Sequence, residues 1–439
     1  MEFYAQYQKK KIGIEEAVTL IRSGDRIVVS PGGSEPLGLF QQLPQIADRV
    51  RDVTLFTMLS VTMHEIYREE KYRGIFNIES AFYSKPIRFV HKSAGAAFVP
   101  AHLRNVGAIM RAKRTDILFV EVSPMDRHGF FSMGPDGGVY QKDLFGVAKT
   151  VVALVNPRCP RTFGDSVVHI SEVDYVCESE HPLGTLPESE SSDEENRIAD
   201  FIADLIDDGA TVQLGIGGIP NAVADKLINK RDLGVHTEMM NDAILKLVEM
   251  GVITGDRKSL HQQKIVTCFT LGSQKLYDFI DDNPSVLHYR CSYTNNPSVI
   301  AQNNNMVSVN TTLQVDFSGQ CASESIVDEQ ISGTGGQVET AVGAQLSPGG
   351  KSIIAFESTA LVKDPETGEM RRLSKIVPQL AGGTFMTLAR TEVDYVVTEY
   401  GIARLKGATI PERARLLIGL AHPDFRGELL DQAKRSLIL

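Results

Sequence analysis

Short apolar runs rich in β-branched residues alternate along the whole chain with longer amphipathic stretches. This alternation is typical of α/β domains with mainly parallel sheets, because each strand is followed by a helix that covers the sheet. The clearest amphipathic stretches end at a glycine, the usual C-terminal helix cap. We expect strands in residues 26–30, 53–58, 116–122, 150–155, 211–217, 264–271 and 351–356, and helices in residues 15–24, 195–209 and 242–251.

A linker is indicated between His181 and Asp200, where Pro, Gly, Ser and acidic residues crowd together before a new helix. Ser192 or Asp193 is expected to cap that helix. A chain of 439 residues is too long for one core, since single cores stop growing at roughly 250 to 300 residues. We therefore expect two α/β domains, residues 1–185 and residues 186–439.

The two halves share a pattern. Residues 20–36 align without gaps on residues 205–221, each reading as a helix, a glycine, a strand and a Gly-Gly pair. Near the end of each half, residues 171–178 match residues 391–398 around the shared sequence VDYV. Two matches in the same order indicate an internal duplication. The alternative is that helix-Gly-strand is simply common in α/β proteins.

Composition excludes several function classes. The formal net charge of −10 argues against nucleic-acid binding, which needs a basic surface. No apolar run approaches the roughly 20 residues of a membrane span, and the first residues lack the apolar core of a signal peptide. We expect a cytoplasmic protein that does not contact membranes. The five cysteines form no CxxC pair and the ten histidines no HxxxH or HExxH, so spacing predicts neither disulfides nor a metal site.

The most distinctive loop comprises Gly215, Ile216, Gly217 and Gly218, between a predicted strand and a predicted helix. Its backbone amides, together with the helix N-terminus, suit an anion such as a phosphate. A dinucleotide-binding loop would need a third glycine where this chain has Pro220, which weakens that interpretation. The alternative is an ordinary tight strand-to-helix turn.

Glu238 stands just after the apolar run LGVHT and before a helix expected to begin around Asn241 or Asp242. Open α/β sheets collect their ligands at such strand-to-helix junctions. A carboxylate near a helix N-terminus is favoured in its charged form, which is the form a nucleophile needs. The alternative is that Glu238 only complements the helix dipole.

A third segment, residues 332–340, places three glycines after a predicted strand and a polar stretch. Its amides suit an oxyanion, whereas the alternative is a flexible surface turn. Nearby, Lys351, Lys363 and Lys375 are candidates for holding phosphates, although an isolated lysine is usually solvated.

Six segments taken together resemble the acetyl-CoA hydrolase/transferase group of class I CoA-transferases, and within it the 4-hydroxybutyrate and butyryl-CoA:acetate CoA-transferases. The resemblance extends over essentially the whole chain. The segments are residues 123–134 (SPMDRHGFFSMG), 214–223 (LGIGGIPNAV), 234–243 (GVHTEMMNDA), 313–320 (LQVDFSGQ), 331–339 (ISGTGGQVE) and 396–407 (VVTEYGIARLKG).

The resemblance implies two similar open α/β domains of the CoA-transferase (NagB/RpiA-like) type that face each other across an active-site cleft. It places the catalytic glutamate at Glu238. It also implies acyl-CoA as a substrate rather than a resident cofactor, small carboxylates as partners, and a homodimer or larger assembly. The implied CoA and oxyanion contacts are Gly215, Ile216, Gly217, Gly218, Leu313, Gly335, Gly336 and Lys363.

The chain departs from the family pattern at one point: GGQxDF becomes GGQVET, with Glu339 and Thr340 in place of Asp-Phe. This affects the expected shape of the neighbouring acyl pocket, for which Val61, Met63 and the turn at residues 31–33 are further candidates. The implied activity is CoA transfer between acetate and a butyryl or 4-hydroxybutyryl group through a glutamyl-CoA thioester. The alternatives are an acyl-CoA hydrolase and a non-catalytic CoA-binding protein.

Overall fold

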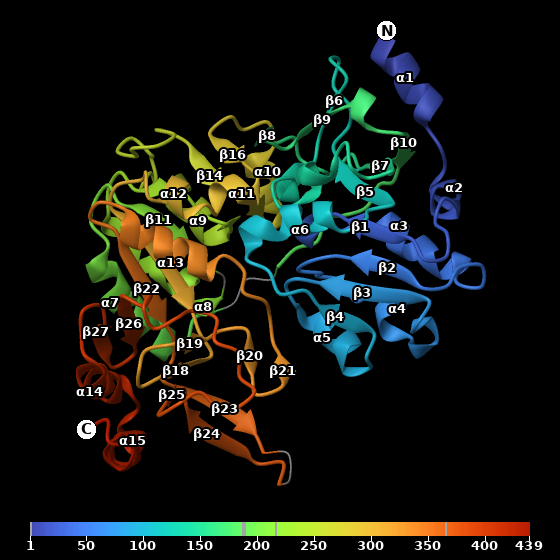
Figure 1. Ribbon diagram of the computed structural model, residues 1–439. Helices are drawn as coiled ribbons and strands as arrows, with labels where there is room; N and C mark the ends of the chain where they lie inside the picture. The colour runs from blue at the N-terminus through green and yellow to red at the C-terminus, as the bar shows by residue number, and fades with distance from the viewer. Residues whose placement is uncertain (1, 187–189, 216, 365–366) are drawn as a thin grey trace. The chain divides into compact units, whose positions relative to one another are not determined.

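A computed structural model describes residues 2–186, 190–215, 217–364 and 367–439 (Figure 1). It is an α/β protein with mainly parallel sheets, as predicted. Among these residues, no helix is long and apolar enough to cross a membrane.

The chain divides into two compact units, and the division is not a single cut. The first unit comprises Met1–Glu188, Thr237–Asp242 and Lys264–Asn295, and the second comprises the rest. The expected assignment of all residues after 185 to one C-terminal domain is therefore wrong for two segments, one of which carries Glu238. The physical reason is burial: Met239, Cys268 and Phe269 join the apolar core that covers one face of the first sheet.

The first unit is built on a seven-stranded parallel sheet of order β10-β7-β5-β1-β2-β3-β4. Neighbouring residues of β1 point to opposite faces, since Val28 enters one core cluster and Ile27 and Val29 the other. Both faces are thus buried, as parallel sheets require. The strands are β1 (Arg26–Val29), β2 (Val53–Phe56), β3 (Phe76–Ser80), β4 (Ala96–Phe98), β5 (Ile117–Val122), β7 (Thr150–Val155) and β10 (Tyr175–Glu178). The helices include α1 (Glu2–Lys10), α2 (Ile14–Thr19), α3 (Leu37–Gln42), α5 (Lys85–Lys92) and α6 (Val106–Ala112).

The second unit is built on a six-stranded sheet of order β12-β11-β17-β22-β26-β27, in which only the β26–β27 pair is antiparallel. Ser192 caps its first helix through a capping box with Glu195, which confirms the predicted cap. The strands are β11 (Thr211–Leu214), β12 (Gly234–Val235), β17 (Met306–Thr311), β22 (Lys351–Ala355), β26 (Tyr395–Thr398) and β27 (Gly401–Arg404). The main helices are α7 (Asp193–Leu205), α8 (Gly218–Lys226), α9 (Asp242–Glu249), α13 (Gln337–Leu346), α14 (Ile410–Leu420) and α15 (Pro423–Arg435).

The topology of the two sheets supports the internal duplication. In the aligned sequences, β1 corresponds to β11, and β10 corresponds to β26. The strand order β10-β7-β5-β1-β2 in the first unit then corresponds, strand by strand, to β26-β22-β17-β11-β12 in the second. Five strands in one order, all parallel, are more than a shared helix-Gly-strand motif would produce.

Candidate active site

Glu238 lies on a rigid backbone. Its carbonyl oxygen accepts the N–H groups of Cys268 and Phe269, both at 3.1 Å, and the hydroxyl of Thr267 at 3.1 Å. Thr267 ends β14 (Ile265–Thr267), Phe269 begins β15 (Phe269–Thr270), and Cys268 lies between the two strands. Strand β15 pairs with β13 (Met239–Met240), which directly follows Glu238. From residue 233 to residue 240, every residue except Glu238 is buried. A partly exposed carboxylate therefore projects from a buried, hydrogen-bonded segment.

The side chain of Glu238 is oriented by an amide that the sequence analysis missed. Asn295 Nδ2 donates to Glu238 Oε2 at 3.0 Å, and Asn295 is itself 1% exposed. Its backbone N–H ends α11 (Cys291–Thr294) by donating to the carbonyl of Cys291. No sequence spacing connects residue 295 with residue 238, so only the fold could reveal this contact.

The helix-dipole alternative for Glu238 finds less support. Helix α9 begins at Asp242, as predicted, and the acidic residue in its first turn is Asp242 itself. The carboxylate of Asp242 accepts hydrogen bonds from the backbone and hydroxyl of Ser273. The Glu238 carboxylate is instead held by Asn295.

Gly138 packs closely against the strand segments that hold Glu238. A Cβ atom at Gly138 would collide with the carbonyl oxygens of Cys268 and Tyr289, and the Gly138 carbonyl accepts the N–H of Cys291 at 2.8 Å. Only a glycine lets the backbone pass this close to the segment that carries Glu238.

The glycine loop of the second unit has the predicted strand-to-helix form. Gly215 follows β11, and α8 begins at Gly218 without a side-chain cap. Gly217 adopts φ 112°, and nothing lies within 4 Å of where its Cβ would stand. A Cβ at Gly218 would collide with the carboxylate of Glu195, so the open side of the loop is at Gly217. Ile216 lies outside the described residues.

Three of the other implied CoA and oxyanion contacts, Leu313, Gly335 and Gly336, lie near the carboxyl end of β17. Leu313 follows this strand, and Gln337 Nε2, in the first turn of α13, donates to the Thr311 carbonyl at 2.9 Å. Gly335, with φ 55°, and Gly336 precede α13 and are buried, so they are not an exposed turn.

The departure from the family pattern lies in the interior of the second unit. Glu339 is 1% and Thr340 3% exposed. The Thr340 hydroxyl accepts from Asn310 Nδ2 at 3.0 Å and donates to the Gly336 carbonyl at 3.0 Å. Thr340 thus fastens the N-terminal turn of α13 to β17, beside the glycines.

One of the candidate lysines, Lys351, is not placed as expected. Lys351 begins β22, whereas the glycine loop follows the parallel strand β11, so the two stand at opposite edges of the sheet. Its ammonium binds the Leu205 carbonyl at 2.6 Å and Asp207 at 3.1 Å. The expectation that Lys351 holds phosphates is therefore wrong. Lys363 is exposed at the end of β23 (Thr359–Lys363), on the hairpin with β24 (Met370–Ser374).

The acyl-pocket candidates of the first unit partly converge. Gly184 donates its N–H to the Gly33 carbonyl at 2.9 Å, and a Cβ on Gly184 would lie 2.5 Å from Val61 Cγ2. The N–H groups of Val61 and Thr62 donate to Glu35 Oε2. Met63 instead packs against the apolar core on the other side of the sheet from Met239.

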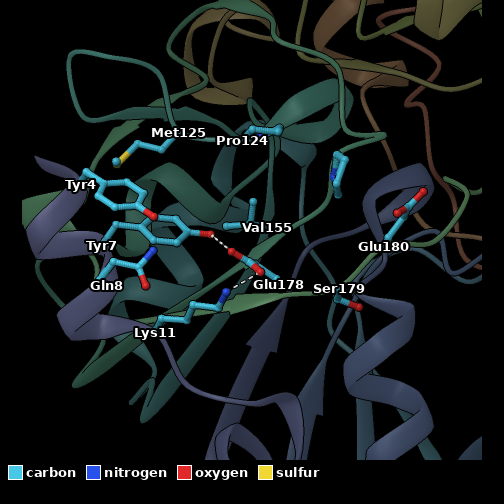
Figure 2. A pocket seen from close by; sticks show the side chains of 11 residues that line it. Tyr4, Tyr7, Gln8, Lys11, Pro124, Met125, Val155, Glu178, Ser179 and Glu180 are labelled. Carbon is cyan, nitrogen blue, oxygen red and sulfur yellow. Dashed lines mark hydrogen bonds and ion pairs between the residues drawn. The ribbon is translucent and has the colours of Figure 1, made fainter.

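A surface cavity of about 580 Å³ lies elsewhere in the first unit (Figure 2). Its polar centre is Glu178, whose carboxylate accepts the Tyr7 hydroxyl at 2.8 Å and the Lys11 ammonium at 2.6 Å, so these groups satisfy one another. None of the expected site residues lines it. The lining residues are Tyr4, Tyr7, Gln8, Lys11, Pro124, Met125, Val155, Pro157, Glu178, Ser179 and Glu180.

Among the described residues, no group of three or more His, Cys, Asp or Glu side chains could hold a metal ion.

Comparison with known proteins identifies relatives along the whole chain. The acetyl-CoA hydrolase/transferase N-terminal domain matches residues 1–187, and the C-terminal domain of the same name matches residues 272–433. The 4-hydroxybutyrate coenzyme A transferase of Clostridium kluyveri is 42% identical, covering 99% of this chain and 100% of the relative. The butyryl-CoA:acetate CoA-transferase of Anaerostipes caccae is 35% identical, covering 100% and 99%.

Solved structures agree with these relatives. A 4-hydroxybutyrate CoA-transferase from Porphyromonas gingivalis superimposes with a TM-score of 0.80 at 34% identity, covering 99% of this chain and 100% of that chain. RipA from Yersinia pestis superimposes with a TM-score of 0.91 at 35% identity, covering 100% of both. The acetyl-CoA hydrolase of Candida albicans is more distant, with 28% identity over 58% of this chain and 48% of its own length.

Proposed function

Because the chain belongs to the acetyl-CoA hydrolase/transferase family and is a CoA-transferase, we propose that it moves CoA between a short-chain acyl-CoA and acetate with Glu238 as the nucleophile. The acyl group is 4-hydroxybutyryl or butyryl, as in the names of its relatives. The observation that carries the proposal is the Glu238 carboxylate, which is partly exposed on a buried backbone and oriented by Asn295.

The reaction proceeds by two exchanges at carbonyl carbon. A Glu238 oxygen attacks the thioester carbonyl of the acyl-CoA, and the C–S bond breaks. CoA departs as the thiolate, and the acyl group and Glu238 are then joined as a mixed anhydride. The thiolate then attacks the glutamyl carbonyl and the C–O bond breaks, which releases the first carboxylate and forms glutamyl-CoA. Acetate reverses these steps. Both leaving groups are stable anions, so no general base is needed.

The surrounding residues have separate roles in this scheme. Asn295 keeps the Glu238 carboxylate in one orientation, which reduces the entropy lost on reaching the reactive geometry. We assign the developing oxyanion to the backbone amides at Gly335 and Gly336, where one donor typically contributes about 3 to 4 kcal/mol. Gly215, Gly217, Gly218, Leu313 and Lys363 are proposed to contact CoA. We propose that the enzyme acts in the cytoplasm. We also propose that it forms a homodimer or larger assembly, whose mass light scattering would measure.

The decisive test traps the covalent intermediate. After incubation with butyryl-CoA alone, borohydride should reduce the glutamyl-CoA thioester, and intact-mass spectrometry followed by peptide mapping should place the modification on Glu238. Glu238→Ala and Glu238→Gln should abolish both the adduct and the transfer of CoA to acetate. Full transferase activity in Glu238→Ala would exclude this role.

Acyl-CoA hydrolysis is the second candidate function, because the family name includes acetyl-CoA hydrolase and one of the relatives is an acetyl-CoA hydrolase. Free thiol release from acyl-CoA is measured with and without acetate. A transferase conserves the thioester, so thiol release should stay far below the rate of acyl-CoA interconversion. Equal thiol release under both conditions, without new acyl-CoA, would identify a hydrolase.

A further inference from the structure

Lys375 is held in place by its backbone in the second unit. Its N–H donates to the Ser358 carbonyl at 2.8 Å, and its carbonyl accepts the N–H of Val315 at 2.9 Å. The residue immediately precedes β25 (Ile376–Val377), which pairs with β18 (Gln314–Asp316). Since β18 begins one residue after Leu313, Lys375 lies beside an implied CoA contact.

The ammonium of Lys375 is partly buried and lacks an anionic partner. Its ring neighbour is Phe356, with the centroid 5.5 Å from Nζ. Across the described part of the chain, Nζ donates no hydrogen bond and no carboxylate oxygen lies within 4.0 Å of it. A buried ammonium normally finds acceptors for its N–H groups, so this one is available to a bound molecule.

Two carboxylates face Lys375 but are engaged elsewhere. Glu399 accepts the backbone N–H of Ser358 at 2.9 Å and its hydroxyl at 2.6 Å. Glu357 accepts the hydroxyl of Ser192 at 3.0 Å. Burial lowers the pKa of Lys375, whereas the charges of Glu357 and Glu399 raise it.

The cluster stands at the edge of the sheet where ligands bind. Phe356 follows β22 and Glu399 follows β26. Both strands run parallel to β11, which ends just before Gly215. Lys375 and the glycine loop are therefore at the same, carboxyl edge of this sheet.

Local charge decides which part of acyl-CoA suits Lys375. One ammonium and two carboxylates sum to −1, so a phosphate, which carries further negative charge, would be repelled. A neutral carbonyl oxygen accepts the N–H groups without adding charge. The pantetheine arm of CoA has two amide carbonyls, between its phosphates and its sulfur.

We propose that Lys375 binds acyl-CoA by donating to an amide carbonyl of the pantetheine arm, and that it does not bind the phosphates. The inference rests on the proposed CoA contacts near Leu313. It adds a recognition residue that the resemblance does not imply.

The test compares three butyryl thioesters as donors, with acetate as the acceptor: butyryl-CoA, butyryl-pantetheine, which lacks all phosphates, and butyryl ethanethiol, which lacks the amides. Lys375→Met should lower kcat/KM about tenfold or more for the first two, since a hydrogen bond to a charged group typically contributes about 1.5 to 3 kcal/mol. It should leave kcat/KM for the third, and the KM for acetate, unchanged.

Each other outcome overturns the proposal. A loss confined to butyryl-CoA would assign Lys375 to the phosphates, an equal loss for all three donors would indicate a structural role, and no loss would mean that water satisfies the ammonium. Lys375→Gln keeps an N–H donor and should recover part of the activity with butyryl-pantetheine. Lys434→Met, at an exposed lysine of α15 in the second unit, serves as the control, with unchanged kcat/KM for butyryl-pantetheine.

These results are separable from the proposed function. If Glu238 is not the nucleophile, the wild-type protein forms no glutamyl-CoA, whatever residue 375 is. If only the Lys375 proposal fails, the wild-type protein and Lys375→Met both form the adduct. Their kcat/KM values then fall by the same factor from butyryl-CoA to butyryl-pantetheine and to butyryl ethanethiol.

Discussion

The loops that follow β1 and β11 occupy corresponding positions in the two duplicated sheets, yet their surroundings differ. In the first unit, buried Asp136 accepts the N–H of Ser34 at 2.7 Å, and a Cβ on Gly32 would lie 3.0 Å from Asp136 Oδ1. In the second unit, the space beside Gly217 is open. A carboxyl group of the chain thus lies beside the first loop, whereas the space beside the second loop is open. Glycines alone do not define an anion site, because the chain can fill the site itself.

The largest effect is expected from removing the Asp136 carboxyl group beside the first loop. Asp136→Ala leaves the Ser34 N–H buried without its acceptor, so the free energy of unfolding should fall by about 3 kcal/mol. Urea unfolding measures it. Asp48→Ala, which removes an exposed aspartate of the same unit, is the control and should have no effect. An unchanged unfolding midpoint in Asp136→Ala would mean that Asp136 does not close this loop.

Filling the open loop should impair binding more than stability. Gly217→Ala places a Cβ in the open space at φ 112°, and we expect KM for acyl-CoA to rise about tenfold, or about 1.4 kcal/mol. Gly407→Ala is the matched control, since Gly407 also has positive φ and open surroundings. It should share the backbone cost of about 1 kcal/mol but leave KM unchanged. Equal KM values in the two variants would remove the distinction between the loops.

Two carboxylates of the first unit also differ in their surroundings: Asp136 is buried and accepts the N–H of Ser34, whereas Glu238 is partly exposed and accepts a hydrogen bond from the Asn295 amide. Asn295→Ala should lower kcat about fivefold to tenfold with little change in KM for acyl-CoA, because the lost hydrogen bond of about 1 kcal/mol orients the nucleophile. Steady-state kinetics distinguish the two parameters. A rise in KM alone would mean that Asn295 serves binding.

The smallest effect concerns pH. Burial, and secondarily the charge of Glu35, raise the pKa of Asp136 from 3.8 to about 7, against the opposing hydrogen bonds from Ser34 and Gly33. The folded state therefore binds the proton more tightly than the unfolded state, and this group's contribution to stability is lost as pH rises from about 4 to 7. Between pH 6 and 7, wild type should lose about 1 kcal/mol relative to Asp136→Asn. Urea unfolding at both pH values compares them, and parallel pH profiles would contradict the assignment.

Sequence alone determined what depends on neighbours in the chain. Hydrophobic periodicity predicted the alternation of strands and helices, the Ser192 side chain predicted the start of α7, and the position of Glu238 before α9 was correct. These features follow from local geometry: a cap, a turn and a one-sided apolar pattern act over a few residues.

Tertiary structure alone decided which distant residues share a site. It assigned the Glu238 segment to the first unit through the burial of Met239, brought Asn295 to the carboxylate, and put Lys351 at the opposite edge from the glycine loop. It also filled one of two similar glycine loops with Asp136. Each outcome depends on strand direction and on burial between segments far apart in the chain, and local pattern contains neither.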